Sequence, residues 1–182
     1  MIFIPTKLRG ATVVDLEPRA DERGFFARTF CEREFSAQGL PSRFPQENLS
    51  RNLRAKTLRG MHFQLAPFRE AKLVRAVSGA IYDVIVDLRP DSPTHLDWFG
   101  VELSAKSGRA LFVPESFAHG FITLADDTDV AYLMTEFFRP EGATGMRWND
   151  PLLAGIEWPA TPAVIAARDA EYPDFDPKRV EV

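Results

Sequence analysis

The chain has 182 residues, a formal net charge of −4 and a hydrophobic content of 45%. This length and composition suit one domain with a sizeable core, and the lack of a basic excess argues against nucleic acid as a partner. Cys31 is the only cysteine, which excludes an internal disulfide and a cysteine-rich zinc site and favours a reducing compartment.

The N-terminus predicts neither export nor membrane insertion. Residues 1–5 form too short an apolar run for a signal peptide and have no basic start. No stretch of the sequence approaches transmembrane length. We therefore expect a cytoplasmic protein that does not bind a membrane.

The N-terminal part predicts short extended segments and one brief helix. Residues 11–14 and 25–30 read as strands, separated by turn-forming residues at 21–24. Residues 32–38 predict a helix that ends at Gly39.

From Thr57 onward the pattern is strand-like. In residues 80–88 alternate positions predict two faces, one with Val84 and the other with Ile85. The later predicted strands are residues 72–77, 80–88, 98–103, 109–113, 120–124 and 129–138. The turn residues Ser78-Gly79 and Asp126-Asp127 indicate hairpins between their flanking strands.

Short strands joined by tight turns are typical of a β-sandwich or β-barrel, and most of all of a double-stranded β-helix, the cupin-like jelly roll. Helical signals are limited to residues 32–38 and a short turn within residues 162–169. We therefore expect an all-β fold with short peripheral helices. No linker or repeat divides the chain, so a single domain over residues 1–182 is expected.

Three histidines, His62, His95 and His119, are candidates for acid–base or metal chemistry. Jelly-roll metal sites often contain a His-x-His pair, since a divalent ion needs several convergent donors, and this chain has none. A metal site could use only His62, His119 and carboxylates. We therefore expect acid–base chemistry, with a metal-dependent enzyme as the lesser alternative. His95 lies in an expected loop and is given no role.

Residues 58–64 (LRGMHFQ) are dense in reactive side chains. Strict strand alternation places Arg59 and His62 on opposite faces, because they are three residues apart. Gly60 between them permits a β-bulge that turns both side chains toward one cavity.

With these motifs the chain resembles the dTDP-4-dehydrorhamnose 3,5-epimerases. The resemblance extends from about residue 4 to about residue 170 and keeps the order of the family's motifs. The matching runs are residues 21–26 (DERGFF), 58–64 (LRGMHFQ), 72–75 (KLVR), 82–89 (YDVIVDLR), 92–94 (SPT), 114–121 (PESFAHGF) and 148–151 (WNDP).

The resemblance implies an isomerase that uses no metal or organic cofactor. His62 matches the base that removes a proton next to the C4 ketone, Asp169 the carboxylate that orients it, and Tyr132 the acid on the opposite face. The residues that match substrate contacts are Arg23, Phe26, Gln46, Asn48, Arg59, Lys72 and His119.

The resemblance gives Lys72 and Arg59 roles that depend on their charge. Lys72 matches a cation near the sugar oxygens, and Arg59 is similar to the arginine that holds the diphosphate. Arg23 and Phe26 match residues that reach the nucleotide of the neighbouring subunit, so the resemblance implies a homodimer.

The chemistry of these residue types agrees with the implied roles. Imidazole titrates near neutral pH, and a paired carboxylate fixes its tautomer. A phenol is a weak acid that a carbanion can still deprotonate. An enolate oxygen needs positive charge nearby, which Lys72 can supply, and the guanidinium of Arg59 suits a diphosphate.

Each of several residues also has a purely structural interpretation. Tyr132 is in phase with apolar neighbours and could be a core tyrosine. His119 could make only a structural hydrogen bond, and Lys72 and Asp83 could form a structural ion pair. By itself, Asp169 reads as a surface carboxylate.

The chain departs from the family pattern at three places. Arg28 replaces a glutamate, Leu133 replaces a lysine after the acid tyrosine, and Phe137-Phe138 replace two tyrosines. Lost hydroxyls remove hydrogen-bond donors near the cavity. The reaction expected is epimerisation of dTDP-4-dehydro-6-deoxy-D-glucose at C3 and C5. The departures leave open an enzyme acting at one carbon and a non-catalytic sugar-nucleotide-binding jelly roll.

Overall fold

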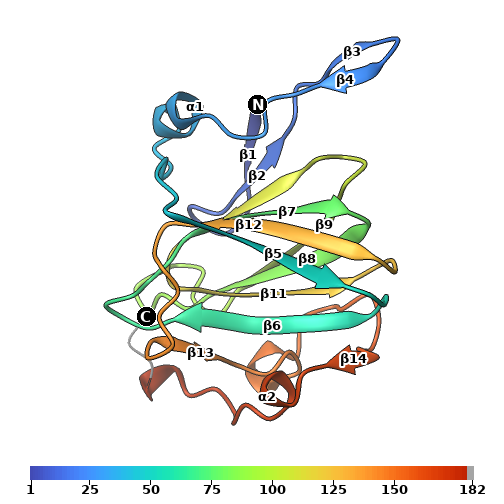
Figure 1. The fold of residues 1–182 in the computed structure, drawn as a ribbon. Coiled ribbons are helices and arrows are strands. Elements are labelled where there is room, and N and C mark those ends of the chain that lie inside the picture. Colours follow the sequence, from blue (N-terminus) through green and yellow to red (C-terminus); the bar gives the residue numbers. More distant parts are fainter. Residues whose placement is uncertain (180–182) are drawn as a thin grey trace.

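A computed structural model describes residues 1–179 as two packed antiparallel sheets with short helices at the periphery (Figure 1). The first sheet contains, in spatial order, β1 (Ile2–Pro5), β2 (Thr12–Asp15), β10 (Ala110–Val113), β7 (Lys72–Ser78), β12 (Thr128–Met134) and β5 (Gln46–Asn52). The second contains β13 (Ala143–Gly145), β6 (Thr57–Gln64), β11 (Phe117–Thr123), β8 (Ala80–Asp87) and β9 (Trp98–Ser104), and β14 (Val164–Ile165) pairs in parallel with β6. This is the expected jelly roll.

The remaining elements are short and lie outside the two sheets. They are the hairpin strands β3 (Arg19–Asp21) and β4 (Gly24–Phe26), the helices α1 (Glu32–Ala37) and α2 (Ala167–Ala170), and the 3₁₀ turns η1 (Pro151–Leu153) and η2 (Pro177–Arg179). Within residues 1–179, no helix has the length and apolar character needed to span a bilayer.

The main apolar core lies between the sheets. Val74 and Val130 of the first sheet pack in one cluster with Ile81, Ile85 and Phe121 of the second. Val84 of the same strand β8 belongs instead to a cluster beneath the C-terminal segment. The predicted two faces of residues 80–88 are therefore confirmed.

Both predicted hairpins are wrong. Ser78-Gly79 connects β7 of the first sheet to β8 of the second, and Asp126-Asp127 connects β11 of the second to β12 of the first. The turn residues reverse the chain as predicted, but in a jelly roll the reversal carries the chain from one sheet to the other. The strands next to each turn therefore face one another instead of sharing hydrogen bonds.

Two predicted strands are too long. The extended segment from residue 25 ends at Phe26, and the one from residue 129 ends at Met134. After β4 the chain leaves the hairpin, and Phe30 packs on Phe35 of α1 with ring centroids 5.0 Å apart. The predicted helix at residues 32–38 is confirmed as α1, with Gly39 at a φ of +70° after its end.

Candidate active site

A β-bulge in β6 brings Arg59 and His62 to one side of the strand. His62 pairs with His119 of β11 and Arg59 with Phe121, so two residues of β6 oppose the single residue Gly120. Gly60 adopts a φ of +126°, and a Cβ there would lie 2.5 Å from the Gly120 Cα. Only glycine fits this close approach, and the bulge predicted from the sequence is confirmed.

Both side chains line a cavity between the sheets. Its volume is about 300 Å³, and its lining residues are Leu49, Ser50, Arg51, Arg59, His62, Lys72, His119, Phe121 and Tyr132. A second cavity of about 210 Å³ shares His62, Lys72 and Tyr132 with the first and also contacts Asn48, Gln64, Glu70, Phe138 and Arg168. Together the two cavities have the size of a small-molecule binding site.

His62 is hydrogen-bonded to a buried carboxylate. Its Nε2 lies 2.7 Å from Asp169 Oδ1, while Asp169 Oδ2 accepts the backbone N–H of Gly60 at 3.1 Å. Burial by itself raises the pKa of Asp169, but the bonds from His62 and Gly60 bring it below its ordinary value. An ionised carboxylate only accepts hydrogen bonds, so Nε2 carries the hydrogen and Nδ1 is left as the basic nitrogen.

Tyr132 faces the same cavity from the opposite sheet. It belongs to β12, beside Asn48 of β5 and Val74 of β7, and it packs partly against the core. Burial raises the pKa of its hydroxyl above 10.0, against the opposing effect of the Arg59 charge. The phenol therefore carries its proton at neutral pH. Tyr132 is both a partly buried core residue and a cavity residue.

Two cations that line the cavity, Arg59 and Lys72, are held differently. Arg59 donates from Nε to Asn52 Oδ1 at 2.8 Å and from Nη2 to the Arg51 carbonyl at 3.3 Å. Lys72 pairs with Glu70 at 2.9 Å and is only 7% exposed. The alternative interpretation, an ion pair between Lys72 and Asp83, is therefore wrong.

Asp83 instead pairs with His119. Its Oδ1 lies 2.8 Å from His119 Nε2, and Asp83 is fully buried. His119 thus has the structural hydrogen bond considered from the sequence and also lines the cavity.

Gln46 and Asn48 lie on β5 at the smaller cavity. Asn48 lines it, and Gln46 donates to Asn48 Oδ1 at 3.3 Å. Gln46 Oε1 also accepts the backbone N–H of Phe138 at 3.0 Å, so Gln46 fixes a residue that lines the cavity.

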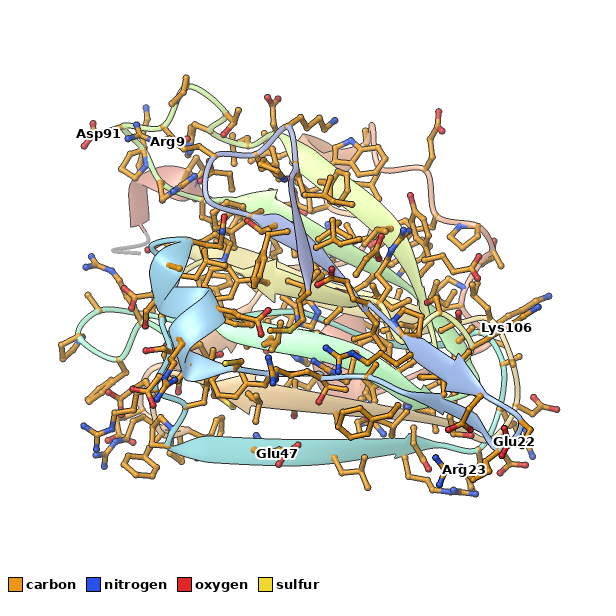
Figure 2. The ribbon with its side chains drawn as sticks, turned by 90° about the horizontal axis from the view of Figure 1, so that it is seen from above. Arg9, Glu22, Arg23, Glu47, Asp91 and Lys106 are labelled. Atoms are coloured by element: carbon orange, nitrogen blue, oxygen red, sulfur yellow. The ribbon has the colours of Figure 1, made fainter. Side chains whose placement is uncertain are left out.

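Arg23 and Phe26 do not join the cavity within this chain. They lie on the β3–β4 hairpin, which projects away from the two sheets, with Arg23 near its tip (Figures 1 and 2). Arg23 pairs with Asp21 at 2.5 Å, and Phe26 is 75% exposed. Arg28, one of the departures, pairs with Glu34 at 2.6 Å.

Sequence reasoning missed Gln64 and Glu70 as members of the site. Gln64 belongs to the run 58–64, but the sequence does not show that its amide bonds to Glu70 and to the backbone of Arg139. Glu70 lies between predicted strands and gave no signal. Within residues 1–179, no three histidine, cysteine, aspartate or glutamate side chains are grouped to hold a metal ion.

The two packed sheets define a cupin-like jelly roll, and an imidazole bonded to a carboxylate and a phenol face its cavity from opposite sheets. The sequence model of the family described as dTDP-4-dehydrorhamnose 3,5-epimerase matches residues 5–177. The chain belongs to this family and is an isomerase.

Individual relatives support the same family assignment. The chain is 47% identical to the dTDP-4-dehydrorhamnose 3,5-epimerase of Methanothermobacter thermautotrophicus over 86% of this chain and 83% of that protein. It superposes with a TM-score of 0.92 and 40% identity on the Bacillus anthracis enzyme of the same name, solved with TDP and pyrophosphate bound, covering 96% and 99% of the two chains. It is also 38% identical to a dTDP-4-dehydrorhamnose 3-epimerase of Streptomyces niveus, over 92% of this chain and 80% of that one.

Proposed function

We propose that the chain converts dTDP-4-dehydro-6-deoxy-D-glucose to dTDP-4-dehydro-L-rhamnose by inverting C3 and C5, without a metal or organic cofactor. One observation carries this proposal: His62, which is bonded to Asp169, and Tyr132 line the same cavity from opposite sheets. Inversion needs a base on one face of the carbon and a proton donor on the other.

In the proposed reaction His62 removes a proton from a carbon beside the C4 ketone, and the electron pair moves to the ketone oxygen. Lys72 stabilises the enolate that forms, because its charge is already in place when negative charge develops. Tyr132 then gives its proton to the opposite face of the carbon as the electron pair returns from the oxygen and the ketone re-forms. His62 loses its added proton to solvent and Tyr132 regains one, which restores both groups. Arg59 binds the diphosphate, and Asn48 and His119 contact the sugar or nucleotide.

Hydrogen exchange with solvent tests the proposal. In heavy water the Tyr132 hydroxyl carries deuterium, so each inverted carbon gains one deuterium atom. We expect label at C3 and C5 by NMR, a loss of about 10²–10⁴-fold in His62→Asn, and normal rates in the matched control His95→Asn. No label at either carbon in the parent protein contradicts the proposal and leaves a sugar-nucleotide-binding protein.

Label at one carbon alone supports a second candidate, an epimerase of C3 or C5 only. Its basis is the replacement of two tyrosines by Phe137-Phe138 and the similarity to a relative named as a 3-epimerase. The metal-dependent alternative requires a stoichiometric metal in elemental analysis of active protein.

We also propose a homodimer in which the β3–β4 hairpin of one subunit reaches the nucleotide of the other. The exposed Phe25 and Phe26 on this hairpin support it, since large apolar side chains cluster at interfaces. Analytical ultracentrifugation should give twice the 20.5 kDa chain mass. Phe26→Ala should raise KM with little change in kcat. A monomer with full activity contradicts this arrangement.

A further inference from the structure

A chain of buried polar groups leads from the end of β6 to Lys72. Glu70 Oε1 pairs with the Lys72 ammonium at 2.9 Å, and Glu70 Oε2 accepts from Gln64 Nε2 at 2.6 Å. Exposure is 7% for Lys72, 9% for Glu70 and 3% for Gln64. All three line the cavity that also contains His62 and Tyr132.

The two oxygens of Glu70 are both occupied, and this restricts where the ammonium can lie. A buried charge without a partner is costly, so Lys72 is held to the one carboxylate beside it. Gln64 in turn prevents that carboxylate from rotating. A flexible lysine side chain thereby becomes a fixed cation.

Gln64 is fixed by backbone groups on both sides. Its Oε1 accepts the N–H of Arg139 at 2.7 Å, and its Nε2 also donates to the Phe68 carbonyl at 3.0 Å and the Phe137 carbonyl at 3.4 Å. The segment 137–139 includes Phe138, which lines the cavity. The position of Lys72 is thus tied to the loop that forms one wall of the site.

We propose that Glu70 and Gln64 are positioning residues that hold the Lys72 ammonium where the enolate oxygen forms. The inference rests on the proposed function and adds to it. Neither residue needs to touch the substrate. Their effect on the reaction passes through Lys72, because stabilisation of developing charge depends on a donor that is placed before the reaction begins.

Kinetics of Glu70→Gln test the idea. The variant keeps the shape and an acceptor for Gln64 but removes the charge that fixes Lys72. We expect kcat to fall about 10- to 100-fold while KM for the nucleotide sugar stays within about 3-fold, as for a group acting on the transition state. Glu102→Gln on the edge strand β9 is the matched control and should leave both constants unchanged.

A double-mutant cycle shows whether Glu70 acts through Lys72. In a Lys72→Met background, Glu70→Gln should lower kcat by less than about 2-fold further, because the group it positions is gone. A second full loss in the double variant overturns the inference. So does a kcat of Glu70→Gln within about 2-fold of the parent.

Glu70→Asp covers the case in which Glu70→Gln fails to fold. This variant keeps the negative charge, but its side chain is shorter by one methylene and so shifts the Lys72 ammonium. If Glu70 positions Lys72, kcat should fall while the melting temperature stays unchanged. An unchanged kcat means that Glu70 only balances charge and overturns the inference. If the parent incorporates no deuterium, the proposed function itself fails and this inference with it. Normal exchange in the parent with unaffected Glu70 variants overturns this inference alone.

Discussion

His62 and His119 are register partners on the antiparallel strands β6 and β11, and each ring is bonded through Nε2 to a buried aspartate. The two pairs differ in exposure: the His62 side chain is 42% exposed and that of His119 only 9%. Asp169 uses both oxygens, whereas Asp83 Oδ2 has no hydrogen-bond partner among the described residues. Of the two imidazoles, His62 is therefore the better placed to accept a proton from a substrate.

Asp169→Asn should lower kcat about 10²–10⁴-fold with little change in KM. His62 and Gly60 bond to different oxygens of the carboxylate, and an amide replaces one of these oxygens with an NH₂ group that cannot accept. If its NH₂ group faces Nε2, the imidazole takes the other tautomer and Nδ1 is no longer basic. Steady-state kinetics with Asp174→Asn, a carboxylate that is 71% exposed, as the control provide the measurement. Equal rates for the two variants would show that Asp169 does not orient the base.

Tyr132→Phe should separate proton removal from inversion. His62 can still exchange the substrate proton with solvent, but no group delivers a proton to the opposite face. We expect product formation to fall about 10²–10⁴-fold while exchange without inversion persists. Tyr82→Phe, on the outer face of the second sheet, is the control. Inversion at the parent rate would remove Tyr132 from the mechanism.

The pH–rate profile of the parent gives a further check on Tyr132. In the proposed reaction the phenol acts in its protonated form, and burial raises its pKa above 10.0, which extends that form to higher pH. No alkaline loss of kcat due to Tyr132 is therefore expected below about pH 10. A fall near pH 8 that Tyr132→Phe abolishes would contradict this assignment.

Gly60→Ala should destabilise the fold more than Gly24→Ala, although both glycines have nearly the same φ, +126° and +128°. An added Cβ at Gly60 meets backbone at 2.5 Å, whereas at Gly24 nothing lies within 4 Å. We expect a loss of more than about 3 kcal/mol at Gly60 and about 1–2 kcal/mol at Gly24. Guanidinium unfolding measures both, and equal losses would mean that β6 and β11 separate easily at the bulge.

Asp87→Asn should lower stability in a pH-dependent way. Asp87 is fully buried and accepts bonds from Arg89, Ser92 and Thr94 at 2.6–3.1 Å. Burial raises its pKa, but these bonds outweigh burial and hold the pKa below 3.8. We expect a cost of about 3 kcal/mol at neutral pH.

The sign of the pH effect follows from the lowered pKa. The unfolded chain binds the proton first, so the stabilisation is complete well above pH 3.8 and is lost as the pH falls through the lower pKa of the folded state. The difference between parent and variant should therefore shrink in unfolding curves below about pH 4. Asp91→Asn, an exposed carboxylate of the loop that follows β8 (Figure 2), is the control. A difference that grows on acidification would contradict the lowered pKa.

Strand periodicity predicted which side chains of residues 80–88 face the core, because alternation is a local property of extended backbone. The turn signals at residues 78–79 and 126–127 predicted where the chain reverses but not which strands pair. Turn chemistry determines local backbone angles, whereas pairing depends on which apolar faces are buried together. The hairpin predictions failed for that reason.

The sequence by itself determined the strand pattern, the bulge at Gly60 and the reactive side chains of residues 58–64. Only the tertiary structure decided that His62, Tyr132 and Asp169 meet, since they come from β6, β12 and α2. His62 and Asp169 are 107 residues apart in the chain, and no local interaction acts over that separation. Burial of the apolar faces of the two sheets brings such residues together, because it does not depend on how far apart the buried side chains are in the sequence. Glu70 and Lys72 are only two residues apart, so their contact is local, but no motif predicted it.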